Sequence, residues 1–170
     1  MRAAVKAATD YIGPVFLRSS RVAMPNIYPV GNCPFVIGQA NTVRLGDDLT
    51  IVACGLMVGM ALDAAAMLVE RGLQARVLDL HTLRPLDKDA LITAARETGA
   101  ILCAEEHLLQ GGMGSNVARV VAEAYPVPMR FVGLADTYTE SADPDDLLKK
   151  YHLTAQDIFQ AALEVVEARC

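Results

Sequence analysis

The sequence predicts an α/β domain with a mainly parallel sheet and helices on both faces. Three short apolar runs are each followed by a helix-like segment: residues 49–55, 75–80 and 100–106 precede residues 56–71, 88–98 and 115–124. Runs this apolar suit strands that are buried on both faces, as in a parallel sheet covered by helices. A functional site is therefore expected where strands end and helices begin.

Capping signals mark the later helices. Asp87 is expected to cap the helix over 88–98, and Gly99 to end it in the left-handed conformation. Residues 143–146 place an aspartate, a proline and two more acids in the order that opens a helix. Thr154 and Asp157 have the spacing of a capping box, so the last helix is expected to begin directly after Thr154.

The chain is predicted to divide into three parts. Residues 129–136 supply a fourth strand, so the sheet domain is expected over residues 48–170. Residues 1–22 contain a fragment of helix and one strand, Pro14–Arg18, and these pieces cannot bury their own apolar faces. Residues 23–47 begin with a proline-rich stretch without periodicity and are interpreted as a linker. Residues 1–22 are then the remnant of another domain.

Composition argues against several classes of partner. The net charge is −5, the pI is about 5.1, and no basic stripe is present, so nucleic acid is not expected. The four cysteines are widely spaced and form no CxxC pair, which favours reduced thiols of a cytoplasmic protein over a structural zinc. The apolar stretch 49–69 has the length of a membrane span, but its β-branched start suits a strand, and Asp63 would lie unpaired in lipid.

The helix predicted over 56–71 is apolar around most of its circumference. Only Asp63, Glu70 and Arg71 are charged. Both the side that faces the sheet and much of the opposite side must therefore be covered. A neighbouring domain or a second subunit is the simplest cover, so we expect the domain to self-associate through this helix or the loops beside it.

A glycine-rich turn follows the third strand. Gly112 and Gly114, with Asp136 at the end of the next strand, imitate a dinucleotide-binding fingerprint. Val117 replaces the third glycine, however, and about six residues separate the strand from the turn, where the fingerprint needs an immediate turn. We interpret Gly111, Gly112 and Gly114 as a structural strand-to-helix loop. The free N–H groups at the helix start could still hold an adventitious anion.

Two histidines follow the ends of predicted strands. His81 and His107 lie near Glu105 and Glu106 in that pattern, and carboxylate with imidazole can form a metal site or an acid–base pair. Neighbouring strand residues point to opposite faces, however, so the two glutamates cannot easily converge on one ion. We expect His81, Glu105 and His107 to make loop hydrogen bonds or interface contacts in a crevice. No metal ligand and no catalytic residue is assigned.

Arg18 and Arg21 lie at the end of the strand predicted over 14–18. Guanidinium groups suit a phosphate, which they can bind with two parallel hydrogen bonds. The alternative is a pair of exposed surface charges. The arginines are the only residues of the chain that we assign to substrate.

The order of motifs resembles the C-terminal part of the transketolases. The motifs are GPVFLRSSR, ARVLDLHTLRPLD, AEEHLLQGGMGSNVARVVAE and ADTYTESADPDDLLKKYHLTAQDI, and the likeness covers nearly all of the chain. It is strongest to split transketolases, whose C-terminal half is a separate chain. The resemblance implies the third domain of a homodimeric enzyme that transfers a two-carbon ketol unit between sugar phosphates. Residues 1–22 would then be the remnant of the preceding pyrimidine-binding domain.

The resemblance also implies where the cofactor lies. In the family, thiamine diphosphate and a divalent metal bind between the first two domains, whose motifs this chain lacks. The chain alone is therefore expected to bind no cofactor and to be inactive without its partner, the N-terminal thiamine-binding part. Arg21 matches the family arginine that contacts the substrate phosphate, and Arg18 is its less certain neighbour.

Two other interpretations stay open. One is the C-terminal domain of a deoxyxylulose-phosphate synthase or of a 2-oxo acid dehydrogenase β chain, which are related thiamine-diphosphate enzymes. The other is a free-standing α/β domain that binds a small ligand, which needs a phosphate loop that the sequence supplies only weakly.

Overall fold

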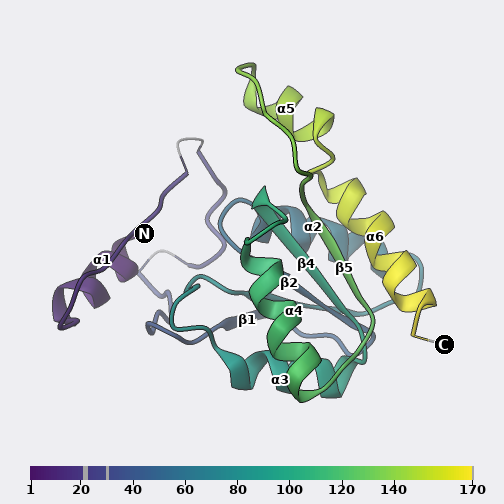
Figure 1. Ribbon diagram of the computed structural model, residues 1–170, viewed down its shortest axis with the longest axis horizontal. Helices are drawn as coiled ribbons and strands as arrows, with labels where there is room; N and C mark the ends of the chain where they lie inside the picture. Colours follow the sequence, from purple (N-terminus) through teal and green to yellow (C-terminus); the bar gives the residue numbers. More distant parts are fainter. Residues whose placement is uncertain (21–22, 30, 170) are drawn as a thin grey trace.

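Five strands form one sheet in the order β1-β3-β2-β4-β5 (Figure 1). The computed structural model describes residues 1–20, 23–29 and 31–169. Three pairs of neighbouring strands are parallel, and β1 pairs antiparallel with β3. The strands are β1 (Asn41–Arg44), β2 (Leu49–Ala53), β3 (Ala75–Asp79), β4 (Ile101–Leu108) and β5 (Met129–Leu134).

Helices cover both faces of this sheet, so the predicted three-layer α/β architecture is confirmed. On one face lie α2 (Met57–Val69) and α6 (Ala155–Glu167). On the other face lie α3 (Lys88–Thr98) and α4 (Met113–Ala124). Two further helices, α1 (Arg2–Asp10) and α5 (Pro144–Lys150), contain no buried residue.

The central strand β2 is buried on both faces, as its apolar sequence predicts. Leu49 and Ile51 belong to the core beneath α2 and α6, while Val52 belongs to the core beneath α3 and α4. Successive strand residues point to opposite faces, so an unbroken apolar run fills both cores at once. The hydroxyl of Thr50 is satisfied within the second layer, 2.9 Å from the hydroxyl of Thr98.

The predicted helix boundaries coincide with caps in the structure. The Asp87 carboxylate accepts a hydrogen bond from the N–H of Ala90 at 3.0 Å, and α3 ends at Gly99 with φ +66°. Asp143 caps α5 in the same way. Thr154 and Asp157 form the capping box of α6. The side-chain and backbone donors of these turns are paired locally, which explains why the sequence alone locates them.

Two predictions about the first 47 residues are wrong in detail. Residues 14–18 form no strand, because no neighbouring strand is present in the described chain to accept their hydrogen bonds. The predicted linker, 23–47, contains a strand that the sequence did not reveal. This strand, β1, pairs with β3 and extends the sheet by one antiparallel edge strand.

The apolar helix α2 is covered within the same chain. Helix α6 packs beside it on the same face of the sheet, and Pro25 and Ile27 lie against Gly59 on its first turns. A second subunit is therefore not needed to cover α2, which corrects the reasoning from its composition. Self-association remains a prediction without this support. None of the helices in the described ranges combines the length and apolarity of a membrane span.

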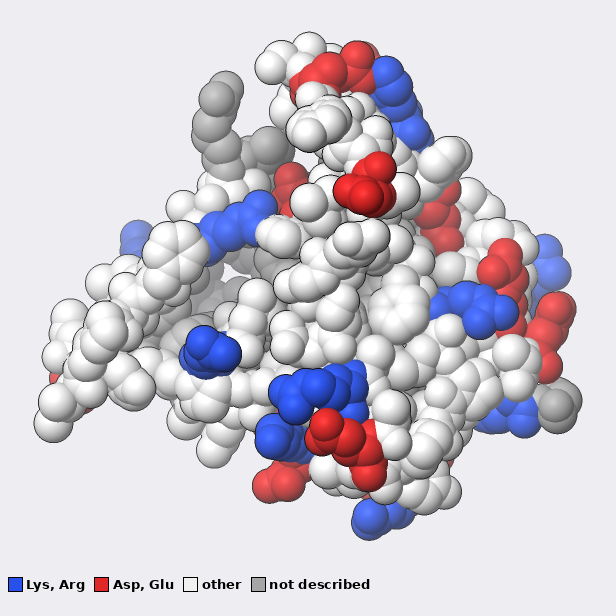
Figure 2. All heavy atoms as spheres, viewed as in Figure 1, with Lys and Arg blue, Asp and Glu red and all other residues white. Residues whose placement is uncertain are grey.

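The first twenty residues project from the sheet domain as an arm, residues 1–20. Helix α1 stands away from the strands in Figure 1, and the arm extends to the side in Figure 2. Ile12 is 100% exposed and Phe16 is 90% exposed. On the face shown in Figure 2, basic side chains lie singly or beside acidic ones, so no basic stripe is seen there.

Candidate functional site

The sheet topology identifies one crevice as the first place to look for a ligand. The chain runs from β2 to β3 on one side and then returns to β4 on the other side of β2. In open α/β sheets, ligands bind beyond the carboxyl ends of the strands at such a reversal of strand order. Cys54 and Gly55 follow β2 at this edge, and the second half of β4 leads into the glycine-rich turn.

The carboxylate of Glu105 closes this crevice from within. The residue is 2% exposed. Its two oxygens accept hydrogen bonds from the backbone N–H groups of Met113, at 2.6 Å, and Gly114, at 2.8 Å. These N–H groups belong to the first turn of α4, where free donors and the helix dipole attract an anion. The protein thus supplies the anion itself, and the expected site for an adventitious anion is already filled.

Glycines 112 and 114 allow the carboxylate to approach the helix. A Cβ atom added to Gly112 would lie 2.4 Å from a Glu105 oxygen and 2.4 Å from the carbonyl oxygen of Leu108. A Cβ atom added to Gly114 would lie 2.8 Å from the ring of Phe131. Gly111 has a different role, because its φ of +73° lies in the region that favours glycine. All three glycines are therefore explained by the turn and by Glu105, without a ligand.

The predicted cluster of histidines and glutamates does not converge. Glu105 is buried, whereas Glu106 is exposed, as the alternation along β4 requires. His107 is exposed, and its Nδ1 lies 3.1 Å from the carbonyl of Leu108. His81 has its Nδ1 2.9 Å from the Thr82 hydroxyl. In the ranges that the structure describes, no group of three or more histidine, cysteine or acidic side chains is placed to hold a metal ion.

His81 belongs instead to a contact with the segment before β1. Its ring stacks on Phe35, with the centroids 4.2 Å apart. Burial lowers the pKa of His81, against the attraction of the nearby Asp79 and Asp87 carboxylates. Asp79 is 8% exposed and accepts a hydrogen bond of 2.6 Å from the hydroxyl of Tyr28. Burial raises the pKa of Asp79, and the hydrogen bond from Tyr28 opposes that rise.

Cys54 lies at the crevice but is not an activated nucleophile. Burial raises the pKa of its thiol to about 12, and the charges of Glu105 and Asp79 act in the same direction. The thiolate is the reactive form of cysteine, so this thiol stays protonated near neutral pH. The positive charge of Arg18 acts in the opposite direction, which places Arg18 close to the same edge of the sheet. Arg21 lies outside the described residues.

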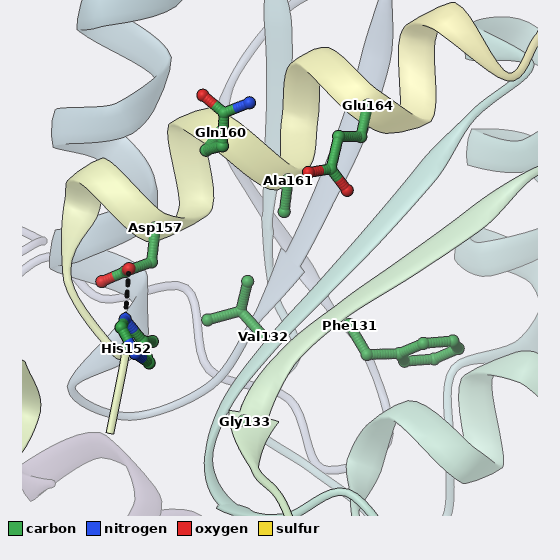
Figure 3. Close-up of a pocket in the computed structure, with 8 residues that line it drawn as sticks. All are labelled: Phe131, Val132, Gly133, His152, Asp157, Gln160, Ala161 and Glu164. Carbon is green, nitrogen blue, oxygen red and sulfur yellow. Dashed lines mark hydrogen bonds and ion pairs between the residues drawn. The ribbon is translucent and has the colours of Figure 1, made fainter. Parts of the chain in front are cut away.

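A second hollow lies between β5 and α6 (Figure 3). It has a volume of about 260 Å³ and is open to solvent. Its polar groups are already paired: His152 and Asp157 lie 3.2 Å apart, and Glu164 lies 3.7 Å from Arg130. Burial acts to raise the pKa of Asp157, but hydrogen bonds from Thr154 and His152 outweigh burial, so the pKa is lowered. The hollow offers a shallow polar surface with no group poised for catalysis.

Tyr28, Asn41 and Asp79 are the site residues that the sequence did not reveal. Tyr28 lies in a stretch without periodicity, so nothing local predicts that it reaches β3. The one available signal is Asp79 itself, an acid at the end of an apolar strand run. A buried carboxylate needs a hydrogen-bond donor, but its identity depends on where the linker runs.

Comparison with known proteins places these features in a family. A family model described as transketolase, C-terminal domain, matches residues 38–158. One of the two subunits of the apulose-4-phosphate transketolase of Phocaeicola vulgatus is 41% identical over 98% of this chain and 53% of its own length. A 1-deoxy-D-xylulose-5-phosphate synthase of Heliobacterium modesticaldum is 36% identical over 96% of this chain and 26% of its own length.

A solved structure has the same fold over almost the whole chain. It is described as a split gene transketolase in an inactive beta4 tetramer, and it matches with a TM-score of 0.95 and 42% identity. The match covers 99% of this chain and 55% of the solved chain. The chain therefore spans about half the length of the apulose-4-phosphate transketolase relative and of the solved structure that it matches.

Proposed function

The chain belongs to the transketolase C-terminal domain family, and on that premise we propose that it is the noncatalytic assembly part of a split transketolase. The complete enzyme would transfer a two-carbon ketol unit between sugar phosphates in the cytoplasm. The partner would be the N-terminal thiamine-binding part, and the assembly would be a homodimer.

The position of Glu105 is the observation that carries this proposal. A domain that binds a phosphorylated ligand on its own would present free N–H groups at the crevice. Here the two N–H groups at the start of α4 are bound by a carboxylate of the same chain. This arrangement favours a structural domain over the free-standing ligand-binding alternative.

The described residues do not fit thiamine diphosphate. The diphosphate would meet the negative charge of Glu105 at the donors that could otherwise bind it. Asp79 and the protonated thiol of Cys54 lie at the same edge of the sheet, and neither group binds a phosphate. In the proposal, the cofactor and its divalent metal are held by the partner, and no chemical step is assigned to this domain.

Mixing tests the proposal directly. Neither this chain nor the thiamine-binding polypeptide alone should transfer ketol units. Together, with the remaining domains supplied, they should do so at a rate that saturates as this chain is added. The measurement is a coupled ketol-transfer assay with a fixed amount of thiamine-binding polypeptide. A thiamine-binding polypeptide whose rate is independent of this chain would contradict the assembly role.

Arg21 is the proposed contact for the substrate phosphate. A sugar phosphate carries two negative charges near neutral pH, and an arginine offers two parallel donors. In the reassembled enzyme, Arg21→Ala should raise KM for phosphorylated sugars by a factor that corresponds to about 1.5–3 kcal/mol of lost charged hydrogen bonding. Unphosphorylated sugars, compared in the same steady-state assay, should be affected much less. Equal effects on both substrates would make Arg21 an ordinary surface charge.

A further inference from the structure

The segment that precedes β1 is fastened across the end of the sheet at several separate points (Figure 1). We call residues 24–29 and 31–40 the strap. At its start, Pro25 and Ile27 lie against Gly59 of α2. At its end, the N–H of Ala40 donates to the Asp87 carboxylate at 2.7 Å. The strap therefore runs from one face of the sheet to the loop before α3.

The middle of the strap is held by a buried polar contact. The Tyr28 hydroxyl donates to Asp79 at 2.6 Å and accepts from the side-chain amide of Asn41 at 3.1 Å. A hydrogen bond to a carboxylate is stronger than a neutral one, and burial strengthens it further. The stacking of Phe35 on His81 lies further along the strap. Tyr28 thus joins the strap to the carboxyl end of a parallel strand by a charged hydrogen bond.

This fastening also restricts the segment that precedes the strap. Arg18 acts on the pKa of Cys54, so its guanidinium group lies beside the end of β2. Tyr28 is bound at the end of β3, the strand next to β2. The chain between them has both ends held at the same edge of the sheet. Releasing Tyr28 would leave Arg18 attached only through the arm.

We propose that Tyr28 and Asp79 are positioning residues that fix the strap and thereby hold Arg18 at the crevice for the substrate phosphate. The inference rests on the proposed function and deepens it, because it names the residues that place the phosphate contact. Neither residue touches substrate. Their effect passes through the strap to the arginine.

Hydrogen exchange of the isolated chain tests the fastening without any activity. Tyr28→Phe keeps the ring and loses the donor, and Asp79→Leu keeps the volume and loses the acceptor. Both should speed amide exchange in the strap, including Ala40, by about tenfold, as expected for the loss of a charged hydrogen bond. Asp79→Asn retains a carbonyl acceptor for Tyr28 and should stay within about threefold of the wild type. Exchange in β2 and β4 should not change in any variant.

Steady-state kinetics of the reassembled enzyme tests the positioning. Tyr28→Phe should raise KM for a phosphorylated acceptor by about three- to tenfold and leave kcat unchanged. KM for an unphosphorylated acceptor should not change. A purely structural role would instead lower the rates with both acceptors in the same proportion. Asp79→Asn should restore most of the affinity that Asp79→Leu loses.

The outcomes separate this inference from the proposed function. If the strap of Tyr28→Phe exchanges at the wild-type rate, the fastening is wrong. If the strap loosens but the ratio of the two KM values is unchanged, the positioning is wrong. If the reassembled wild type shows no ketol transfer, the proposed function fails and the positioning of a substrate phosphate fails with it. The exchange experiment still decides whether Tyr28 fastens the strap.

Discussion

Glu105→Ala is expected to lower the free energy of unfolding by about 3–5 kcal/mol. The substitution removes a carboxylate that is 2% exposed and that accepts two backbone hydrogen bonds. The N–H groups of Met113 and Gly114 would lose their partner in a buried place, and each unsatisfied donor costs about 1–3 kcal/mol. The favourable interaction of the negative charge with the start of α4 would disappear as well. Urea denaturation, followed by circular dichroism, measures the change.

Two variants make the Glu105 measurement specific. Glu106→Ala changes the adjacent, exposed carboxylate and should alter stability by no more than about 0.5 kcal/mol. Glu105→Gln keeps one oxygen acceptor for two donors, so its cost should lie between those of Glu106→Ala and Glu105→Ala. A loss below about 1 kcal/mol for Glu105→Ala would show that the carboxylate is not what holds the turn.

Gly112→Ala is expected to cost about 3 kcal/mol, because the added methyl group has no space. The Cβ atom would lie 2.4 Å from the Leu108 carbonyl oxygen and 2.4 Å from a Glu105 oxygen. The φ of Gly112 is −74°, which any residue adopts, so the cost is steric and not conformational. The same denaturation experiment measures it.

Gly111 supplies the matched control for Gly112. Its Cβ would meet nothing within 4 Å, and only its φ of +73° disfavours alanine, so Gly111→Ala should cost about 1–2 kcal/mol. Combining each glycine variant with Glu105→Ala separates the two causes. Gly112→Ala should cost less when the carboxylate is absent, whereas Gly111→Ala should be additive. Additive behaviour of both pairs would contradict the close approach of Glu105 to Gly112.

The parts of the fold that the sequence predicts are those whose interactions are local or periodic. Asp87 and Gly99 bound α3 because each satisfies the backbone groups of its own helix end. The apolar run of β2 predicts a central strand because both of its faces are buried. These features need no knowledge of distant residues.

The features that the sequence missed depend on distant partners. Strand β1 has a mixed sequence, and it is a strand because β3 offers a free edge. Residues 14–18 have a strand-like sequence but no edge to join in the described chain. The packing of α6 beside α2 could not be predicted from the apolar surface of α2 alone.

The candidate site was predicted only in outline. Glu105, His81 and the glycine turn were placed at strand ends, and the structure puts Glu105 inside the fold, where it binds the start of α4. The sequence did not reveal this contact, because a glutamate in a strand has no period that indicates its hydrogen-bond partner. The contact of Tyr28 with Asp79 was missed for the same reason.

Calorimetric titration of thiamine diphosphate and magnesium into the isolated chain tests the central claim most directly. The claim is that this domain contributes assembly and leaves cofactor binding to its partner. With the donors at the start of α4 bound to Glu105, the titration should give only the heat of dilution up to millimolar cofactor. A saturable heat with a micromolar Kd would contradict the account, because it would require a diphosphate site that the crevice does not provide.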